Sequence, residues 1–308
     1  FQPRIIKEAL EYEQAMNLLV LSKELKGISI VIDKKRDYLY GGYFSHVLGY
    51  MGSISEDRYR ELKNQDYYLD DKDSLGLSNS QTHEKTETKI VKQIVKEGDI
   101  VIDVGAHIGY YTLIFAKIVG TKGKVFAFEA NKKNFDILEK NVLKNNFKNV
   151  ICENMIISDK IGKVQMYSLD SSTANRLFDE GDNDKIEVDS ITLDEYFKQQ
   201  SKKINFIKLD IQGAEPLAIK GMNQIMENNS EIKIIQEWWP DGIKKFDIEP
   251  TEHIINLEKK GYDIIEIDDI QNKIIKTNSE KLIKKYPNKK IQDINLFCIK
   301  NSEEYNLQ

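Results

Sequence analysis

Short apolar runs alternate with segments of helical periodicity from Lys85 onward, and this alternation limits the possible folds more than any other feature of the chain. Apolar runs of about four to eight residues bounded by turn residues are typical of buried strands, and apolar spacings of about three and four residues are typical of helices. Such alternation predicts an α/β fold, a mostly parallel sheet with helices on both faces. We therefore expect a ligand at the carboxyl ends of the strands.

The expected strands are apolar runs at residues 100–104, 124–129, 150–157, 204–210, 232–237, 262–267 and 295–299. The expected helices have one apolar face and cover residues 84–96, 111–118, 132–145 and 251–259. Two further segments, 163–167 and 185–188, are expected as inserted edge elements. The lysine-rich segment 273–290 is predicted to be the solvated face of a helix and its loop.

A change in the choice of basic residue predicts a domain boundary near residues 76–81. Arginine occurs four times in the first 77 residues and afterwards only as Arg176, although lysines continue. Eight of the 15 tyrosines also precede residue 78. Residues 76–81 are rich in glycine, serine and asparagine, as suits a linker. We therefore expect a small α+β segment at residues 1–77 and an α/β domain at residues 78–308.

Composition excludes several classes of protein. With 40% hydrophobic residues the chain can bury a core, so general disorder is excluded. The net charge of -5 gives the chain no general attraction for nucleic acid, and none is expected as a partner. No apolar run reaches the roughly 18 residues of a membrane span. Cys152 and Cys298 are far apart and form neither a disulfide framework nor a zinc site, and no metal is expected.

The sharpest site signal is a strand that runs through Asp103 into a glycine turn, Gly105 to Gly109, followed by a helix. Gly105 permits a tight turn and the close approach of a ligand. The third glycine of the dinucleotide fingerprint is absent, as is a phosphate-binding loop. A pyrophosphate ligand is therefore disfavoured, and the turn alone could be merely structural.

A second acid, Glu129, ends the next expected strand 26 residues after Asp103. A carboxylate in this position can accept hydrogen bonds from both hydroxyls of a ribose, although an isolated one would more often be a solvated strand end. Together with the glycine turn, Glu129 indicates a nucleoside that carries no diphosphate. S-adenosylmethionine is the obvious candidate.

Two further strands end in acids at the same expected edge. Asp210 precedes Gly213 and a helix, so it is either a cleft residue or a cap for the region of Glu215. Glu237 precedes Trp238 and Trp239, which form an acceptor pocket or cover the core. S-adenosylmethionine is a methyl donor, and a methyl transfer needs alignment of the acceptor and a base that takes up its proton. As base we rank Asp210 first and Glu237 second, before the histidines His107 and His253.

These motifs, at residues 103–112, 128–131 and 207–215, resemble the FkbM family of S-adenosylmethionine-dependent methyltransferases over about residues 85–270. The resemblance implies a Rossmann-like class I methyltransferase fold and O-methylation of a sugar, a glycan or a small secondary metabolite in the cytoplasm. It implies that the glycine turn holds the methionine part, Glu129 the ribose, and Ser158 and Asp159 the adenine. The implied cofactor-binding residues are Asp103, Gly105, His107, Gly109, Glu129, Asn131, Ser158 and Asp210.

Two residues depart from the family pattern. His107 stands where asparagine is frequent, and Gln212 stands where glutamate is common. The second change removes a carboxylate and makes a metal site built on Asp210 doubtful.

The first 77 residues resemble the non-catalytic N-terminal pedestal of class B penicillin-binding proteins, through segments 36–41, 46–52 and 54–56. The chain has no Lys-Thr-Gly triplet, and its one Ser-x-x-Lys sequence, from Ser230 to Lys233, leads into an expected buried strand. Penicillin binding is not predicted. A fusion, a mis-joined reading frame and an artificial chimera all remain open.

Two other functions compete with the methyltransferase. In the first, a degenerate methyltransferase fold serves as a non-catalytic scaffold in cell-envelope assembly. In the second, the fold carries dehydrogenase chemistry, against which the missing third glycine argues. The methyl acceptor and the oligomeric state stay open.

Overall fold

The structure is a computed structural model that describes residues 75, 83–168, 176–178, 184–199, 203–286 and 293–302. The chain divides into two compact units, Phe1–Tyr59 and Arg60–Gln308. All described residues belong to the second unit. The pedestal-like segment, apart from Leu75, and the predicted boundary at residues 76–81 lie outside the described residues.

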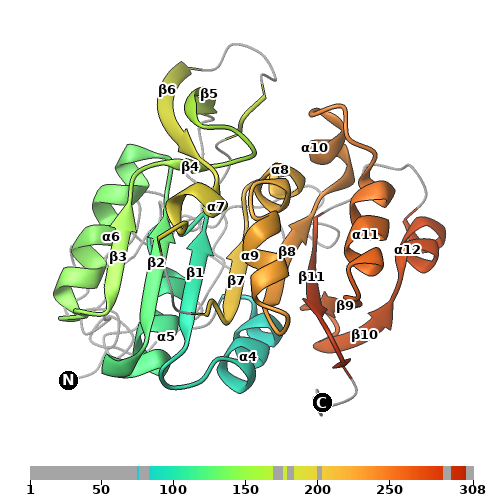
Figure 1. The fold of residues 1–308 in the computed structure, drawn as a ribbon, viewed down its shortest axis with the longest axis horizontal. Coiled ribbons are helices and arrows are strands. Elements are labelled where there is room, and N and C mark those ends of the chain that lie inside the picture. The colour runs from blue at the N-terminus through green and yellow to red at the C-terminus, as the bar shows by residue number, and fades with distance from the viewer. Residues whose placement is uncertain are drawn as a thin grey trace, which may run out of the picture. The chain divides into compact units, whose positions relative to one another are not determined.

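The main sheet has eight strands in the order β10-β9-β11-β8-β7-β1-β2-β3 (Figure 1). Strands β3, β2, β1, β7 and β8 pair in parallel, and β11 runs antiparallel to both β8 and β9. β10 is antiparallel to β9 at the edge. The strands are β1 Ile100–Val104, β2 Lys124–Phe128, β3 Val150–Glu153, β7 Phe206–Leu209, β8 Lys233–Trp238, β9 Asp263–Asp268, β10 Lys273–Thr277 and β11 Ile294–Ile299.

Helices cover both faces of this sheet because successive strand residues face opposite sides. Val101 packs with α4 and α5 in one core, and its neighbour Ile102 packs with α8, α9 and α11 in the other. The α/β prediction is therefore confirmed. The helices are α4 Lys85–Ile94, α5 Tyr110–Val119, α6 Lys132–Lys144, α7 Leu193–Tyr196, α8 Glu215–Lys220, α9 Asn223–Asn228, α10 Pro240–Lys244, α11 Pro250–Lys259 and α12 Ser279–Lys285.

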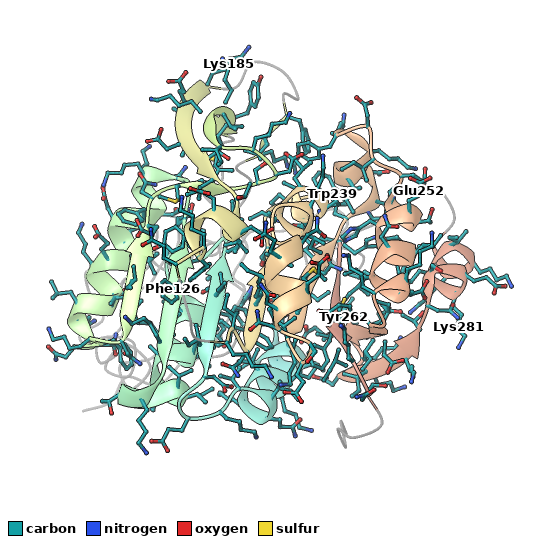
Figure 2. All side chains as sticks on the ribbon, in the orientation of Figure 1. Phe126, Lys185, Trp239, Glu252, Tyr262 and Lys281 are labelled. Carbon is teal, nitrogen blue, oxygen red and sulfur yellow. The ribbon has the colours of Figure 1, made fainter. Side chains whose placement is uncertain are left out.

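Side-chain directions follow the amphipathic pattern of the sequence. Phe126 on β2 is buried between the sheet and its helices, whereas Lys185, Glu252 and Lys281 point away from the ribbon (Figure 2). Among the described residues, no helix is long and apolar enough to cross a membrane.

A second sheet carries the predicted insertion, with strands β4 Ile156–Ile157, β5 Gly162–Ser168 and β6 Asp184–Ile191 in the order β4-β6-β5. The single strand expected at residues 150–157 is wrong, because β3 ends at Glu153 and β4 joins the other sheet. Asn154 bends the chain between them, since its amide donates to the carbonyls of Glu129 (2.8 Å) and Ala130 (3.0 Å). The small sheet stands over the carboxyl ends of β1 and β2 (Figure 1).

The lysine-rich segment is only partly helical. Residues 273–277 form the edge strand β10, and α12 follows after Asn278, whose side chain caps it at Lys281 N–H (2.8 Å). The sequence pattern did not predict β10 as a strand because none of its five residues is buried, and Lys273 and Lys276 are exposed, as is common on an edge strand.

Candidate active site

A cavity of about 360 Å³ lies at the carboxyl ends of the central parallel strands. This volume is within the usual range for a small-molecule site. Its walls come from the turns after β1, β2 and β7, from the end of β8, and from the small sheet. The predicted site residues that line it are Gly105, His107, Glu129, Asp210 and Glu237.

Gly105 forms the floor of the cavity where the ends of β1 and β7 meet. Its φ angle is +80°, and its N–H donates to the carbonyl of Phe128 at 2.9 Å. A Cβ atom at this position would lie 1.9 Å from the carbonyl oxygen of Asp210. Only glycine fits, because the backbone after β7 occupies the space that a side chain would need, and the bare backbone of Gly105 is left lining the cavity.

Glu129 is held rigidly at the end of β2 and is 7% exposed. Its Oε2 accepts the N–H of His107 and its Oε1 accepts the N–H of Asn131, both at 2.8 Å. Burial raises the pKa of Glu129 to about 7, and hydrogen bonds from these two N–H groups and from the Asn134 side chain oppose that rise. Because a carboxylate offers about four acceptor positions, Glu129 can still accept a hydrogen bond from a ribose hydroxyl.

Four residues predicted to bind cofactor lie outside the cavity lining and support its walls instead. The buried Asp103 accepts a hydrogen bond from the Thr112 hydroxyl at 2.5 Å, which ties β1 to α5. Gly109 is the N-cap of α5, where a Cβ would lie 2.8 Å from Leu138. The other two are Asn131, which caps α6, and Ser158, which is buried with its N–H on the carbonyl of Ile191.

Asp210 belongs to a buried ion cluster. The Lys208 ammonium lies 2.9 Å from Asp210 Oδ2 and 3.4 Å from Oε1 of Glu87, a residue of α4. Lys208 lowers the pKa of Asp210 against the effect of burial, whereas burial raises the pKa of Glu87 to about 8. Asp210 is therefore an anion with a fixed partner at the cavity wall. Asp210 does not cap α8, whose N-cap is Ala214 and which has no side-chain cap hydrogen bond. Glu215 Oε1 instead accepts the N–H of Ile211 in the preceding turn (2.8 Å).

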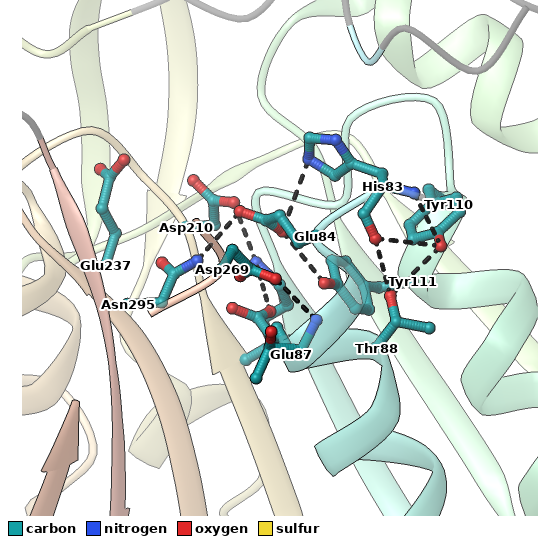
Figure 3. Close-up of polar contacts among 12 residues, drawn as sticks. His83, Glu84, Glu87, Thr88, Tyr110, Tyr111, Asp210, Glu237, Asp269 and Asn295 are labelled. Atoms are coloured by element: carbon teal, nitrogen blue, oxygen red, sulfur yellow. Dashed lines mark hydrogen bonds and ion pairs between the residues drawn. The ribbon is translucent and has the colours of Figure 1, made fainter. Parts of the chain in front are cut away.

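Glu237 faces Asp210 across the cavity (Figure 3) and is 4% exposed. Burial raises its pKa well above the ordinary value, and the charges of Asp210, Glu215 and Asp293 add to the rise. The Gln212 amide donates to both carboxylate oxygens, at 3.1 and 3.3 Å. Glu237 therefore retains its proton to a higher pH than Asp210 does.

Of the remaining predicted candidates, one histidine lines the cavity, and the other histidine and both tryptophans do not. His107 lines the cavity in a left-handed conformation, with φ +51°. His253 lies outside the lining on α11, where its Nε2 is 2.8 Å from Gln236 Oε1, so its place as a candidate base is wrong. Trp238 is a core residue whose indole N–H donates to Pro250. Trp239 packs outside the cavity, 4.5 Å from the Arg176 guanidinium.

Three acidic or basic residues that the sequence did not single out also line the cavity: His83, Glu84 and Asp293. Glu84 accepts hydrogen bonds from the Tyr111 hydroxyl (3.0 Å) and from Asn295 (2.9 Å), as Figure 3 shows. These residues flank expected elements and follow no motif spacing, so only the folded chain brings them together.

Residues 103–264, just over half of the chain, match the Methyltransferase FkbM domain. The chain belongs to the FkbM methyltransferase family. Residues 1–79 match the penicillin-binding protein dimerisation domain, which confirms the second resemblance. Both matches agree with the motifs on which the sequence analysis depended.

Individual proteins are similar to this chain at lower sequence identity. The chain is 25% identical over 199 residues to methyltransferase sdnD of Sordaria araneosa, and the match covers 53% of this chain and 73% of sdnD. An O-methyltransferase of Bacillus cereus solved with S-adenosylhomocysteine has a TM-score of 0.41 at 14% identity, over 84% and 96% of the chains. An rRNA methylase of Streptococcus thermophilus has a TM-score of 0.38 at 11% identity, over 71% and 95%.

The FkbM cofactor, S-adenosylmethionine, fits the residues present. The tight backbone turn at Gly105, which lines the cavity, suits the methionine part, and the buried carboxylate of Glu129 suits the ribose diol. The cavity also has an apolar wall, formed by Phe128, the half-buried Met155 and the buried Ile156, and this wall suits adenine. Within the described part of the chain, no cluster of three or more histidine, cysteine, aspartate or glutamate side chains could hold a metal ion.

Proposed function

We propose that the chain is an S-adenosylmethionine-dependent O-methyltransferase that acts on a hydroxyl of a sugar, a glycan or a small secondary metabolite. The observation that carries the proposal is one cavity in which Gly105 and Glu129 adjoin two further carboxylates, Asp210 and Glu237. We place the methyltransferase domain at residues 78–308 and its activity in the cytoplasm, with no nucleic-acid partner.

The cavity has two parts, one suited to the cofactor and one suited to the methyl acceptor. When bound, S-adenosylmethionine supplies an activated methyl group on a sulfonium. The residues after β1 and β2 orient the adenosyl end, and Asp210, Gln212 and Glu237 lie toward β8, where an acceptor can be oriented. Because the transfer is an in-line displacement, alignment of the acceptor oxygen lowers the barrier, and a carboxylate must remove the hydroxyl proton.

Electrostatics reverse the order of the two candidate bases. Lys208 keeps Asp210 ionised and lowers its pKa, which makes it a weak base. The raised pKa of Glu237 makes it the stronger proton acceptor once it is ionised. We therefore propose Glu237 as the base and Asp210 as the group that orients the acceptor hydroxyl.

The change Glu237→Gln should lower kcat about 100-fold, the smaller end of the effect expected for a general base. S-adenosylhomocysteine affinity should stay the same. Asp210→Asn should raise the KM for the acceptor more than it lowers kcat. The kcat and KM of both variants are measured with the acceptor that the labelled-methyl screen described below identifies. Wild-type turnover in Glu237→Gln would exclude that residue, and loss of turnover in Asp210→Asn alone would restore the original order.

Cofactor binding is tested by calorimetric titration with S-adenosylhomocysteine. We expect micromolar binding that weakens at least about 30-fold in Glu129→Ala, because losing hydrogen bonds to a charged group costs about 2 kcal/mol or more. Glu153→Ala at the end of neighbouring β3 is the control, since Glu153 does not line the cavity. Absence of binding by the wild type would favour the scaffold, and binding of NADH would favour the dehydrogenase.

The acceptor is sought by transfer of a labelled methyl group to a panel of sugars, glycans and small hydroxylated metabolites. RNA is included, because a labelled RNA product would contradict the proposed acceptor class. Transfer to a hydroxyl compound that disappears in Glu129→Ala supports the proposal.

A further inference from the structure

The turn after β7 holds Gln212 in a conformation that non-glycine residues seldom adopt. Gln212 has a φ angle of +56° and the following Gly213 has +92°. Glu215, a fully buried residue of α8, accepts the N–H of Ile211 at 2.8 Å and so closes the turn. Left-handed non-glycine residues persist where surrounding structure enforces them, and they cluster at functional sites.

Packing against α10 prevents this turn from relaxing. A Cβ on Gly213 would lie 2.6 Å from the carbonyl carbon of Gly242. A Cβ on Gly242 would in turn lie 2.1 Å from the Trp239 ring. The turn is thus in backbone contact with α10, the Trp239 indole packs on the other side of Gly242, and this packing fixes the backbone next to Gln212.

The enforced conformation directs the Gln212 amide at Glu237. Its nitrogen is 3.1 Å from Oε1 and 3.3 Å from Oε2, and both residues line the cavity. Among the described residues, the charges that raise the pKa of Glu237 most belong to acids, namely Asp210 after β7, Glu215 in α8 and Asp293 before β11, and Asp293 also shares a side-chain hydrogen bond with Glu237. Gln212 is therefore the neutral donor in a carboxylate-rich wall, and its N–H groups favour the ionised form of Glu237.

We propose that Gln212 is a positioning residue that holds the Glu237 carboxylate toward the acceptor and stabilises its ionised form. The inference rests on the proposed function in one respect, the role of Glu237 as base. A glutamate at position 212 would instead place a second carboxylate about 3 Å away and share a proton with Glu237. The amide in place of an acid thus keeps a further carboxyl away from Glu237, which already shares a hydrogen bond with Asp293.

The test follows the protonation of Glu237 in the intact chain without any acceptor. The infrared band of protonated carboxylic acid is recorded against pH, and subtraction of the Glu237→Gln spectrum isolates the contribution of Glu237. Gln212→Asn keeps an amide and tolerates the left-handed backbone, but it is one methylene too short to reach. Gln212→Met keeps the length and removes the donor. Gln224→Asn on α9, away from the cavity lining, is the control.

We expect the midpoint of the Glu237 band to move up by about one pH unit in both Gln212 variants and to stay in place in the control. An unchanged midpoint in Gln212→Asn would overturn the proposal and leave Gln212 as a turn residue. Should Gln212→Met not fold, the asparagine variant decides alone. Calorimetry with S-adenosylhomocysteine on the same samples separates the two ideas: an unmoved band with intact binding refutes the positioning role only, and absent binding refutes the proposed function.

Discussion

Replacing Gly105 with alanine is expected to destabilise the chain by about 2–5 kcal/mol and to weaken S-adenosylhomocysteine binding more than 100-fold. Two penalties add: a φ of +80° costs a residue with a Cβ about 1–2 kcal/mol, and overpacking costs about 1–3 kcal/mol. The Cβ would lie 1.9 Å from the carbonyl oxygen of Asp210, so the ends of β1 and β7 must move apart where they line the cavity. Denaturant unfolding and calorimetry measure the two effects.

Gly261→Ala is the matched control for this substitution. Gly261 has nearly the same φ, +86°, but nothing lies within 4 Å of a Cβ there. The control should lose only the conformational part, about 1–2 kcal/mol, and should bind S-adenosylhomocysteine normally. Equal losses in both variants would show that the close approach of β1 and β7 at Gly105 is not what demands glycine.

Lys208→Met is expected to destabilise the chain by about 3–5 kcal/mol, the usual cost of removing one partner of a buried ion pair. Asp210 and the fully buried Glu87 would lose their shared cation, which lies 2.9 and 3.4 Å from their oxygens. The loss should be smaller at pH 5 than at pH 8. Without Lys208 both acids have raised pKa values in the folded state, so folding takes up protons and stability falls as pH rises.

A second substitution tests the cause. In Lys208→Met/Glu87→Met the buried carboxyl of Glu87, which has lost its cation, is absent as well, so part of the stability should return. Lys203→Met removes a lysine from an exposed pair with Glu231 and should change stability little. A pH-independent loss in Lys208→Met, or no recovery in the double variant, would indicate lost packing on the Tyr111 ring instead, which lies 4.6 Å from the ammonium.

Sequence periodicity predicted the elements of the main sheet well where local pattern and tertiary role agree. The helices at residues 84–96, 111–118, 132–145 and 251–259 are present to within about two residues of the expected ends. The prediction of a single strand at residues 150–157 was wrong because Asn154 bends the chain through hydrogen bonds to the backbone after β2. No local pattern encodes a contact between residues 25 positions apart.

The candidate site was predicted in part. Gly105, Glu129, Asp210 and Glu237 share one cavity, because parallel strands end at one edge of the sheet and their motifs stand at those ends. Asp103, which belongs to the first of these motifs, and Ser158, which follows a later strand, are buried and do not line the cavity, which spacing along the chain cannot reveal. The preference for Glu237 over Asp210 as base could not be predicted either, since it depends on the buried Lys208 and on Asp293.

The sequence by itself determined the α/β class, the family and the glycine turn, because periodicity and motif spacing are local properties of the chain. Only the tertiary structure decided which acids face the cavity, which of them carries a raised pKa, and that Gln212 points at Glu237. Those properties depend on burial and on through-space distances between strand ends, α4 and the start of β11, and such distances exist only after the sheet has formed.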